Sequence, residues 1–189
     1  MIELMVTLAV AAIVVSMAVP SFQSVVNGNK LAAAANELVA SLQVARMEAI
    51  RRNQRAGVCA STNTAEGEDA TCAAANVDGW IAFVDDNLDG DFDKGTDTLL
   101  RVSILEPAVE LLGNPALGNS IVFRPDGLAR DESSGAGPGS GLLDAVVRLC
   151  IATRRPADNG RDLGIASGSR FAITESNGGG ACAAPANPP

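Results

Sequence analysis

Two hydrophobic patterns follow one another at the start of the chain. From Leu4 to Val19 no residue is charged, and Glu3 is the only charged residue in front of this run. The run is about as long as the shortest helix that spans a bilayer, roughly 17 residues. We expect one long helix from Ile2 to about Arg52, weakest at residues 27–29 and terminated by Gly57. In its second half, apolar residues recur at alternating steps of four and three, the spacing of one helical face: Leu31, Ala35, Leu38, Leu42, Ala45 and Ala49.

After the helix, short stretches of strand-forming residues alternate with turn residues, a pattern typical of β-structure. One long helix followed by an antiparallel sheet indicates the α+β class. We expect residues 1–20 to be a transmembrane or filament-core segment, 21–55 its amphipathic continuation and 56–189 a β-rich globular domain. The expected strands are 56–60, 80–84, 98–105, 120–124, 142–152 and 164–174, with an acidic loop at 85–97, a Gly- and Ser-rich loop at 131–141 and a hairpin connection at 154–161.

Composition narrows the possible functions. The chain has 189 residues, a net charge of −8, and neither histidine nor tyrosine. Without histidine, Ser-His-Asp triads and histidine-based metal sites are unavailable, which argues against an enzyme. The acidic balance argues against general binding of nucleic acids, because such binding relies on neutralising phosphates. We therefore expect no enzymatic activity and no cofactor other than the calcium ion considered below.

The cysteines form an even set of four without Cys-x-x-Cys spacing: Cys59, Cys72, Cys150 and Cys182. Zinc ribbons need closely paired ligands, so a metal site is the weaker interpretation. Behind a membrane-targeting N-terminus, disulfides in an oxidising compartment are the better one. Four cysteines allow three pairings, and proximity in the sequence favours Cys59–Cys72 and Cys150–Cys182.

The acidic segment resembles the front of a calcium loop. Oxygen-bearing side chains occupy alternate positions, and Gly90 suits the sharp turn that such loops need. Thr96 occupies the position where a bidentate Glu should close the site. The flanking residues have the pattern of strands rather than helices. We therefore prefer a solvated acidic hairpin loop and keep calcium binding as the alternative. The candidate ligands are Asp85, Asn87, Asp89, Asp91 and Asp93.

Ile2-Glu3-Leu4 opens the apolar run, and Ala18-Val19-Pro20 closes it. This arrangement resembles the N-terminal motif of type IV pilins and pseudopilins, in which an apolar helix follows an Ile/Leu-Glu-Leu/Val core and ends near a proline. Later segments resemble the minor pilins and pseudopilins of the GspH/FimT/FimU group: residues 36–38 and 45–52, Gly79-Trp80-Ile81-Ala82-Phe83-Val84-Asp85, Leu99-Leu100-Arg101 and Phe123-Arg124-Pro125-Asp126-Gly127.

The resemblance implies a minor subunit of a type IV pilus or a type II secretion pseudopilus, which helps to initiate or cap a filament. It implies a single pass through the bacterial inner membrane, a globular domain in the periplasm and incorporation into the filament. The implied partners are other minor and major pilins or pseudopilins, the inner-membrane assembly platform and a prepilin leader peptidase. The motif's Phe, the Gly before it and the basic leader are missing ahead of Glu3. We therefore expect the true start to lie upstream of Met1.

By its position in the motif, Glu3 would neutralise the N-terminal amine of a neighbouring subunit during assembly. The physical reason is that an unpaired carboxylate is expensive in a medium of low dielectric constant, so a register that pairs it is favoured.

Arginines concentrate near the C-terminus of this acidic chain. Some members of the FimT branch bind DNA for uptake through a C-terminal Gly-Arg-x-Arg element, and the nearest segments here, Gly160-Arg161-Asp162-Leu163 and Gly168-Ser169-Arg170, match it incompletely. Arginines on a hairpin usually form a solvated face, so DNA binding for natural transformation is the alternative function. Its candidate residues are Arg154, Arg155, Arg161 and Arg170.

Overall fold

The computed structural model describes residues 2–73, 77–113, 117, 120–130 and 141–186, and for residues 17–20 it describes the backbone alone. Most of the expected Gly- and Ser-rich loop, residues 131–140, lies outside the described residues. The order of the described elements confirms the α+β class: α1 (Ile2–Arg52), β1 (Arg55–Ser61), the 3-10 helix η1 (Thr64–Asp69), β2 (Gly79–Asp85), β3 (Thr98–Ile104), β4 (Glu110–Gly113), β5 (Ser120–Phe123), β6 (Ala145–Cys150), β7 (Gly160–Ala166) and β8 (Arg170–Ser176).

Helix α1 confirms the long helix that the two hydrophobic patterns predict, and it runs without interruption through residues 27–29. The prediction that Gly57 terminates the helix is wrong. The helix ends at Arg52, and Asn53 follows with φ +54°, in the left-handed region that asparagine often adopts at helix C-termini. Gly57 instead lies inside β1, where an added Cβ would come within 3.2 Å of the Phe83 ring.

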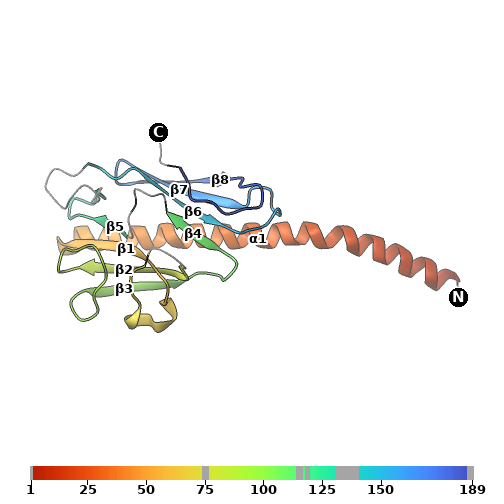
Figure 1. The fold of residues 1–189 in the computed structure, drawn as a ribbon, viewed down its shortest axis with the longest axis horizontal. Coiled ribbons are helices and arrows are strands. Elements are labelled where there is room, and N and C mark those ends of the chain that lie inside the picture. Colours follow the sequence, from red (N-terminus) through yellow and green to blue (C-terminus); the bar gives the residue numbers. More distant parts are fainter. Residues whose placement is uncertain (1, 74–76, 114–116, 118–119, 131–140, 187–189) are drawn as a thin grey trace.

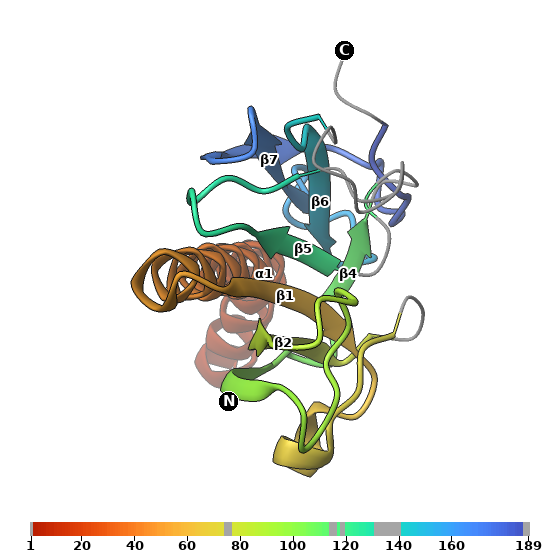
Figure 2. The same ribbon diagram turned by 90° about the vertical axis from the view of Figure 1, so that its left-hand side faces the viewer.

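The strands form two four-stranded antiparallel sheets, with the orders β3-β2-β1-β5 and β4-β6-β7-β8. The C-terminal half of α1 contacts strands of both sheets and lies alongside them, while its N-terminal half extends away from the domain (Figures 1 and 2). The predicted apolar stripe is the helix's contribution to the core, since none of its residues is more than 3% exposed: Leu31, Ala35, Leu38, Leu42, Ala45 and Ala49.

Two features of the second sheet differ from the sequence-based expectation. The stretch expected as one strand, 164–174, belongs to two strands, β7 and β8, joined by a turn in which Ser167 and Gly168 have φ of 51° and 66°. Glycine is required there, because a Cβ at Gly168 would lie 2.3 Å from the Ala129 carbonyl oxygen. Strand β4 was not expected at all, and it forms the edge of the sheet by pairing with β6.

Trp80, at the start of β2, lies in the core. Its side chain is 1% exposed, and its indole N–H donates a hydrogen bond to Ser41 Oγ at 2.9 Å. Ser41 is itself fully buried on α1. The tryptophan of β2 is therefore joined to the helix by a polar contact as well as by apolar packing.

Candidate functional site

The N-terminal half of α1 is an apolar surface that its own domain leaves uncovered (Figure 1). The helix is long and apolar enough to cross a membrane. The two hydroxyl groups within the uncharged run are satisfied internally, because Thr7 Oγ1 donates to the Leu4 carbonyl at 3.0 Å and Ser16 Oγ donates to the Ile13 carbonyl at 2.7 Å. A segment with satisfied polar groups suits an apolar environment. The side chains that are more than half exposed include Ile2, Leu4, Met5, Val6, Leu8, Val10, Ile13, Val14, Val15, Phe22 and Val25.

Glu3 is the one carboxylate of this exposed half. It lies in the first turn of α1, where the positive end of the helix dipole favours a negative charge. Its side chain is exposed and makes no hydrogen bond or ion pair with another residue of the described part of the chain. Within the described part of the chain, Glu3 is therefore the single charged side chain at this end of the apolar helix.

The helix leaves the domain at residues 27–30, which we call the neck. On one side, Asn27 Nδ2 donates to the Arg155 carbonyl at 2.8 Å. On another, Lys30 Nζ forms an ion pair with Glu106 at 3.0 Å. Leu31 follows as the first fully buried residue of the helix. Both polar contacts join positions far apart in the sequence, so the neck could not be identified from the sequence alone.

The structure does not gather the four candidate DNA-binding arginines. Arg154 and Arg155 lie together beside the neck, whereas Arg161 forms an ion pair with Glu175 at 2.9 Å. Arg170 lies at the opposite end of the sheet, next to Ser169, whose carbonyl accepts a hydrogen bond from the Arg46 guanidinium of α1 at 3.2 Å.

The separation follows from the helix, because Asn27 and Arg46 are 19 residues apart. At 1.5 Å per residue this is about 28 Å along the axis. DNA binding by these four arginines stays a prediction, without one surface that contains them all.

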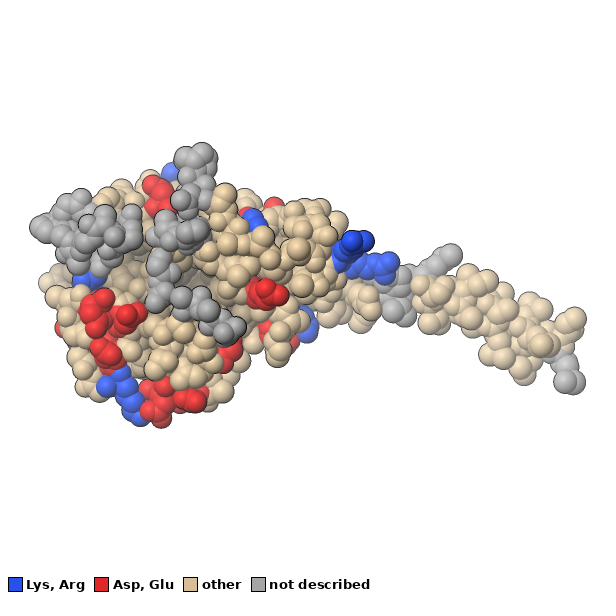
Figure 3. Space-filling model, in the orientation of Figure 1, with Lys and Arg blue, Asp and Glu red and all other residues tan. Residues whose placement is uncertain are grey.

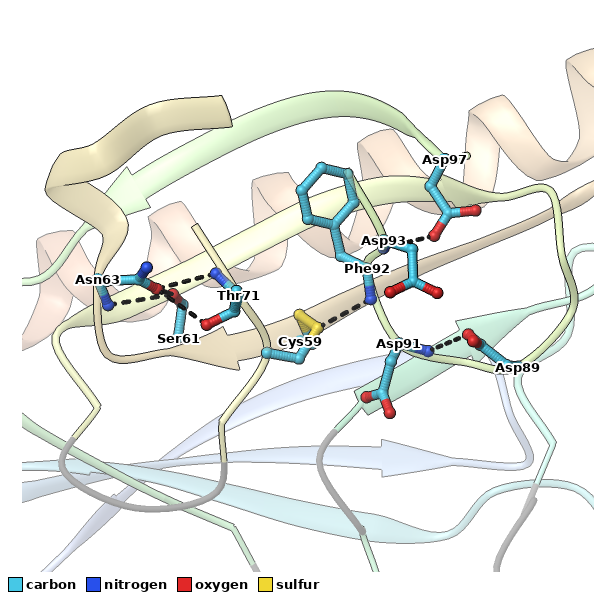
Figure 4. Close-up of a disulfide and its surroundings, with 10 residues drawn as sticks. Cys59, Ser61, Asn63, Thr71, Asp89, Asp91, Phe92, Asp93 and Asp97 are labelled. Atoms are coloured by element: carbon cyan, nitrogen blue, oxygen red, sulfur yellow. Dashed lines mark hydrogen bonds between the residues drawn. A yellow bond between two sulfur atoms is a disulfide. The ribbon is translucent and has the colours of Figure 1, made fainter. Parts of the chain in front are cut away.

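The acidic loop between β2 and β3 is closed by its own hydrogen bonds (Figure 4). The backbone N–H of Asp89 donates to Asp85 Oδ1 at 3.1 Å, and the N–H of Asp91 donates to Asp89 Oδ1 at 2.9 Å. The Asn87 side chain stands between two carboxylates and donates to Asp89 at 2.8 Å and to Asp93 at 2.9 Å. Loop N–H groups thus occupy several of the oxygens that a cation would need.

Burial and repulsion between like charges raise the pKa of two carboxyl groups in this loop. Burial raises the pKa of Asp85, whose side chain is fully buried, while the Arg55 guanidinium, 3.5 Å away, acts in the opposite direction. Burial also raises the pKa of Asp91, and repulsion from Asp89 and Asp93 adds to it. In Figure 3, Asp and Glu side chains gather at the end of the domain far from the projecting helix.

A metal site would need ligand atoms that converge. Within the described residues, the one group of three candidate ligands whose atoms lie within 4.8 Å of one another is Glu110, Cys150 and Cys182. These two cysteines are bonded to each other, so they offer no thiolate to a metal. Calcium binding by the acidic loop stays a prediction.

The cysteines form the two disulfides that proximity in the sequence favours, Cys59–Cys72 and Cys150–Cys182. The first joins β1 to the segment after η1, and the backbone N–H of Phe92 donates to Cys72 Sγ at 3.2 Å (Figure 4). The acidic loop is thereby held against this disulfide. The second joins the end of β6 to the C-terminal segment.

Comparison with known proteins agrees with this architecture. The structure is similar to two crystal forms of the type IV minor pilin FimU from Pseudomonas aeruginosa (strain PAO1), both at 18% sequence identity and a TM-score of 0.51. The matches cover 77% and 76% of this chain and 89% and 92% of the FimU chains, and at this identity they show a shared fold.

The family of the chain is assigned by comparing its sequence with models of known families. No curated protein sequence matches the chain. The family model described as type II transport protein GspH matches residues 34–169, which is more than two thirds of the chain. The chain therefore belongs to the GspH family and has the pilin-like fold of the minor pilins and pseudopilins.

Proposed function

We propose that this chain is a minor subunit of a type IV pilus or a type II secretion pseudopilus and that it helps to initiate or cap the filament. The observation that carries the proposal is the division of α1 into two halves. The first half exposes apolar side chains on every side, and the second half is the core of the domain. A monomer in water would not leave such a surface uncovered, so the first half requires lipid or neighbouring helices.

In this proposal the first half spans the bacterial inner membrane and the domain lies in the periplasm until the subunit enters the filament. The partners are other minor and major pilins or pseudopilins, together with the inner-membrane assembly platform. A prepilin leader peptidase acts on the chain if a leader precedes it. Head-to-tail contacts between unlike surfaces generate such filaments, because these contacts do not close on themselves.

Glu3 supports the same conclusion. A lone carboxylate at the end of an apolar helix is costly when it enters an apolar assembly without a partner. The amine of a neighbouring subunit would supply that partner, so Glu3 would select the register in which a new subunit docks.

The outer face of the second half of α1 adds further support. A helix packed on a monomeric domain normally carries charged residues on the side away from the core. Here the exposed residues opposite the buried stripe are uncharged as far as Ile50, Met47 and Ile50 are 61% and 52% exposed, and the first charge on this face is Arg51 in the last turn. This face is suited to contact other subunits along the filament. It comprises Asn29, Ala33, Asn36, Gln43, Met47 and Ile50.

The proposal is tested by replacing Glu3→Gln at the native chromosomal locus and measuring the protein in membranes and in sheared filaments. We expect the variant to reach the membrane at the normal level and to be lost from the filament fraction, together with the minor pilins that co-purify with it. Glu68→Gln, which removes one exposed carboxylate from η1, is the matched control and should behave as wild type. Filament fractions that contain the Glu3→Gln protein at wild-type abundance would refute the role of Glu3.

A further inference from the structure

Arg154 and Arg155 form an exposed pair beside the neck, in the segment that connects β6 to β7. Among the described residues their guanidinium groups make no hydrogen bond or ion pair. The backbone that carries them is nevertheless fixed. The Arg155 carbonyl accepts the Asn27 side chain at 2.8 Å, and the Arg155 N–H donates to Thr153 Oγ1 at 3.2 Å. Asn159, which is buried, donates to the Ile151 carbonyl at 2.9 Å and so closes the segment.

The position of this pair along α1 matches one layer of a membrane. The hydrocarbon core of a bilayer is about 30 Å thick, which corresponds to about 20 helical residues. Counted from Leu4, such a span ends near Gln23. Asn27 lies four residues farther on, or about 6 Å along the axis. Polar headgroups extend roughly 5–7 Å beyond the hydrocarbon on each side, so the segment that touches Asn27 lies at headgroup level.

The charges near the neck favour an anionic partner. The protein as a whole has a net charge of −8, yet Lys and Arg side chains gather where the helix leaves the domain (Figure 3). Two carboxylates belong to the same region: Glu106 is paired with Lys30, and Asp158 lies in the same connecting segment as the arginines. Lys30, Arg154 and Arg155, counted with these two carboxylates, leave one net positive charge around the neck.

We propose that Arg154 and Arg155 bind the phosphodiester groups of anionic phospholipids at the membrane surface. The inference rests on the proposed function, because it requires that the first half of α1 spans the bilayer. The planar guanidinium group donates two parallel hydrogen bonds to a phosphate, a geometry that the lysine ammonium does not offer. Anionic headgroups attract basic residues next to a membrane-spanning helix. Such binding would hold the domain in one orientation on the bilayer before the subunit enters a filament.

The test uses the full chain in lipid nanodiscs, with a spin label at Ala157→Cys. All four native cysteines are in disulfides, so the label reacts with the added cysteine alone. Accessibility of the label to a water-soluble relaxation agent is compared between discs of phosphatidylcholine alone and discs that also contain phosphatidylglycerol. We expect the phosphatidylglycerol discs to reduce accessibility. In Arg154→Gln/Arg155→Gln we expect the ratio of docked to undocked domains to fall by about 30-fold, because two basic residues are lost next to the membrane surface.

The matched control is Arg51→Gln/Arg170→Gln, which removes the same charge from the far end of the domain and should keep the wild-type response. Equal accessibility in the two lipids, or a response that survives Arg154→Gln/Arg155→Gln, would overturn the inference. Protection of the label by duplex DNA but not by phosphatidylglycerol would also overturn it and assign the pair to DNA. A second label at Val10→Cys separates the two proposals. If this label is accessible to water in the discs, the membrane span itself fails, and the lipid contact fails with it.

Discussion

The buried contact between Trp80 and Ser41 gives the sharpest prediction for how α1 is joined to the sheets. The Trp80 N–H donates to Ser41 Oγ, and that hydroxyl donates in turn to the Glu37 carbonyl at 3.1 Å. Both side chains are at most 1% exposed. Ser41→Ala therefore removes the acceptor of the indole N–H at a place that solvent does not reach.

The expected loss follows from two opposing effects. An unsatisfied buried donor costs about 1–3 kcal/mol. Alanine is favoured over serine in a helix by roughly 0.5 kcal/mol, which offsets part of this cost. We therefore expect Ser41→Ala to lower the free energy of unfolding by about 0.5–2.5 kcal/mol. Ser103→Ala is the comparison variant, because Ser103 Oγ lies 3.4 Å from Ser41 Oγ but does not accept the indole N–H. It removes a hydroxyl that donates to Glu37 Oε1 at 2.9 Å, but the half-exposed Glu37 keeps its ion pair with Arg101 at 2.6 Å.

The assay is urea unfolding of the full chain in detergent micelles, followed by tryptophan fluorescence. Trp80 is the only tryptophan, so the emission reports on the surroundings of this one side chain. Ser41→Ala should unfold at lower urea than Ser103→Ala, and its folded emission maximum should shift relative to that of wild type. Unfolding of Ser41→Ala at the wild-type urea concentration, or equal losses in the two variants, would refute the reasoning.

Three further predictions concern charges, disulfides and calcium. Burial tends to raise the pKa of Asp162, but the ion pair with Arg148, at 2.6 and 2.7 Å, and the hydrogen bond from Ser176 Oγ, at 3.0 Å, together lower the pKa below its usual 3.8. The stability that the ionised carboxylate contributes is present above pH 3.8 and is lost as pH falls through the lower folded-state pKa. Asp162→Asn should therefore lower the free energy of unfolding by about 1–2 kcal/mol at pH 7 and by progressively less in acid. Urea unfolding at several pH values measures this difference. Replacing both Cys59 and Cys72 by alanine should lower the free energy of unfolding by about 2–4 kcal/mol, measured in the same way, and an unchanged value would contradict a stabilising role. Calcium should leave the melting temperature unchanged, whereas a rise that Asp89→Asn abolishes would identify the acidic loop as a calcium site.

Features that depend on near neighbours in the sequence could be predicted. The extent of α1 follows from an uncharged run and a stripe at helical spacing, both of which are local patterns. The disulfides could be predicted for a similar reason, since each pairs a cysteine with its neighbour among the four. The helix end at about Arg52 was likewise predicted correctly, but the residue that ends it was not, because Gly57 is a common terminator by residue type, while the chain in fact turns at Asn53.

The strands show where local patterns become insufficient. Strand β4 has four residues, two of them partly buried, and its place is set by pairing with β6 more than thirty positions away. Its sequence alone has too few alternating residues to indicate a strand. The turn between β7 and β8 did carry a signal, because Ser167-Gly168 is a turn dipeptide. The apolar and small residues on both sides of it continue the strand pattern through the turn and therefore predict a single strand.

The arginines near the C-terminus show most clearly why a site could not be derived from sequence order. Arg154, Arg155, Arg161 and Arg170 lie within 17 residues of one another, which favours a single basic patch. Yet β7 carries the chain from the neck to the far end of the domain before Arg170 begins β8. A seven-residue strand covers about 23 Å at 3.3 Å per residue, so neighbours in the sequence become opposite ends of a sheet. What gives Arg155 its place is its contact with Asn27, 128 positions away, and that contact exists only because the second sheet folds back along α1. The chemical role proposed for these arginines therefore depends on the level of α1 that each one reaches: under the proposed membrane span, the pair at the neck lies at the headgroup layer, and Arg170 lies in solvent at the other end of the domain.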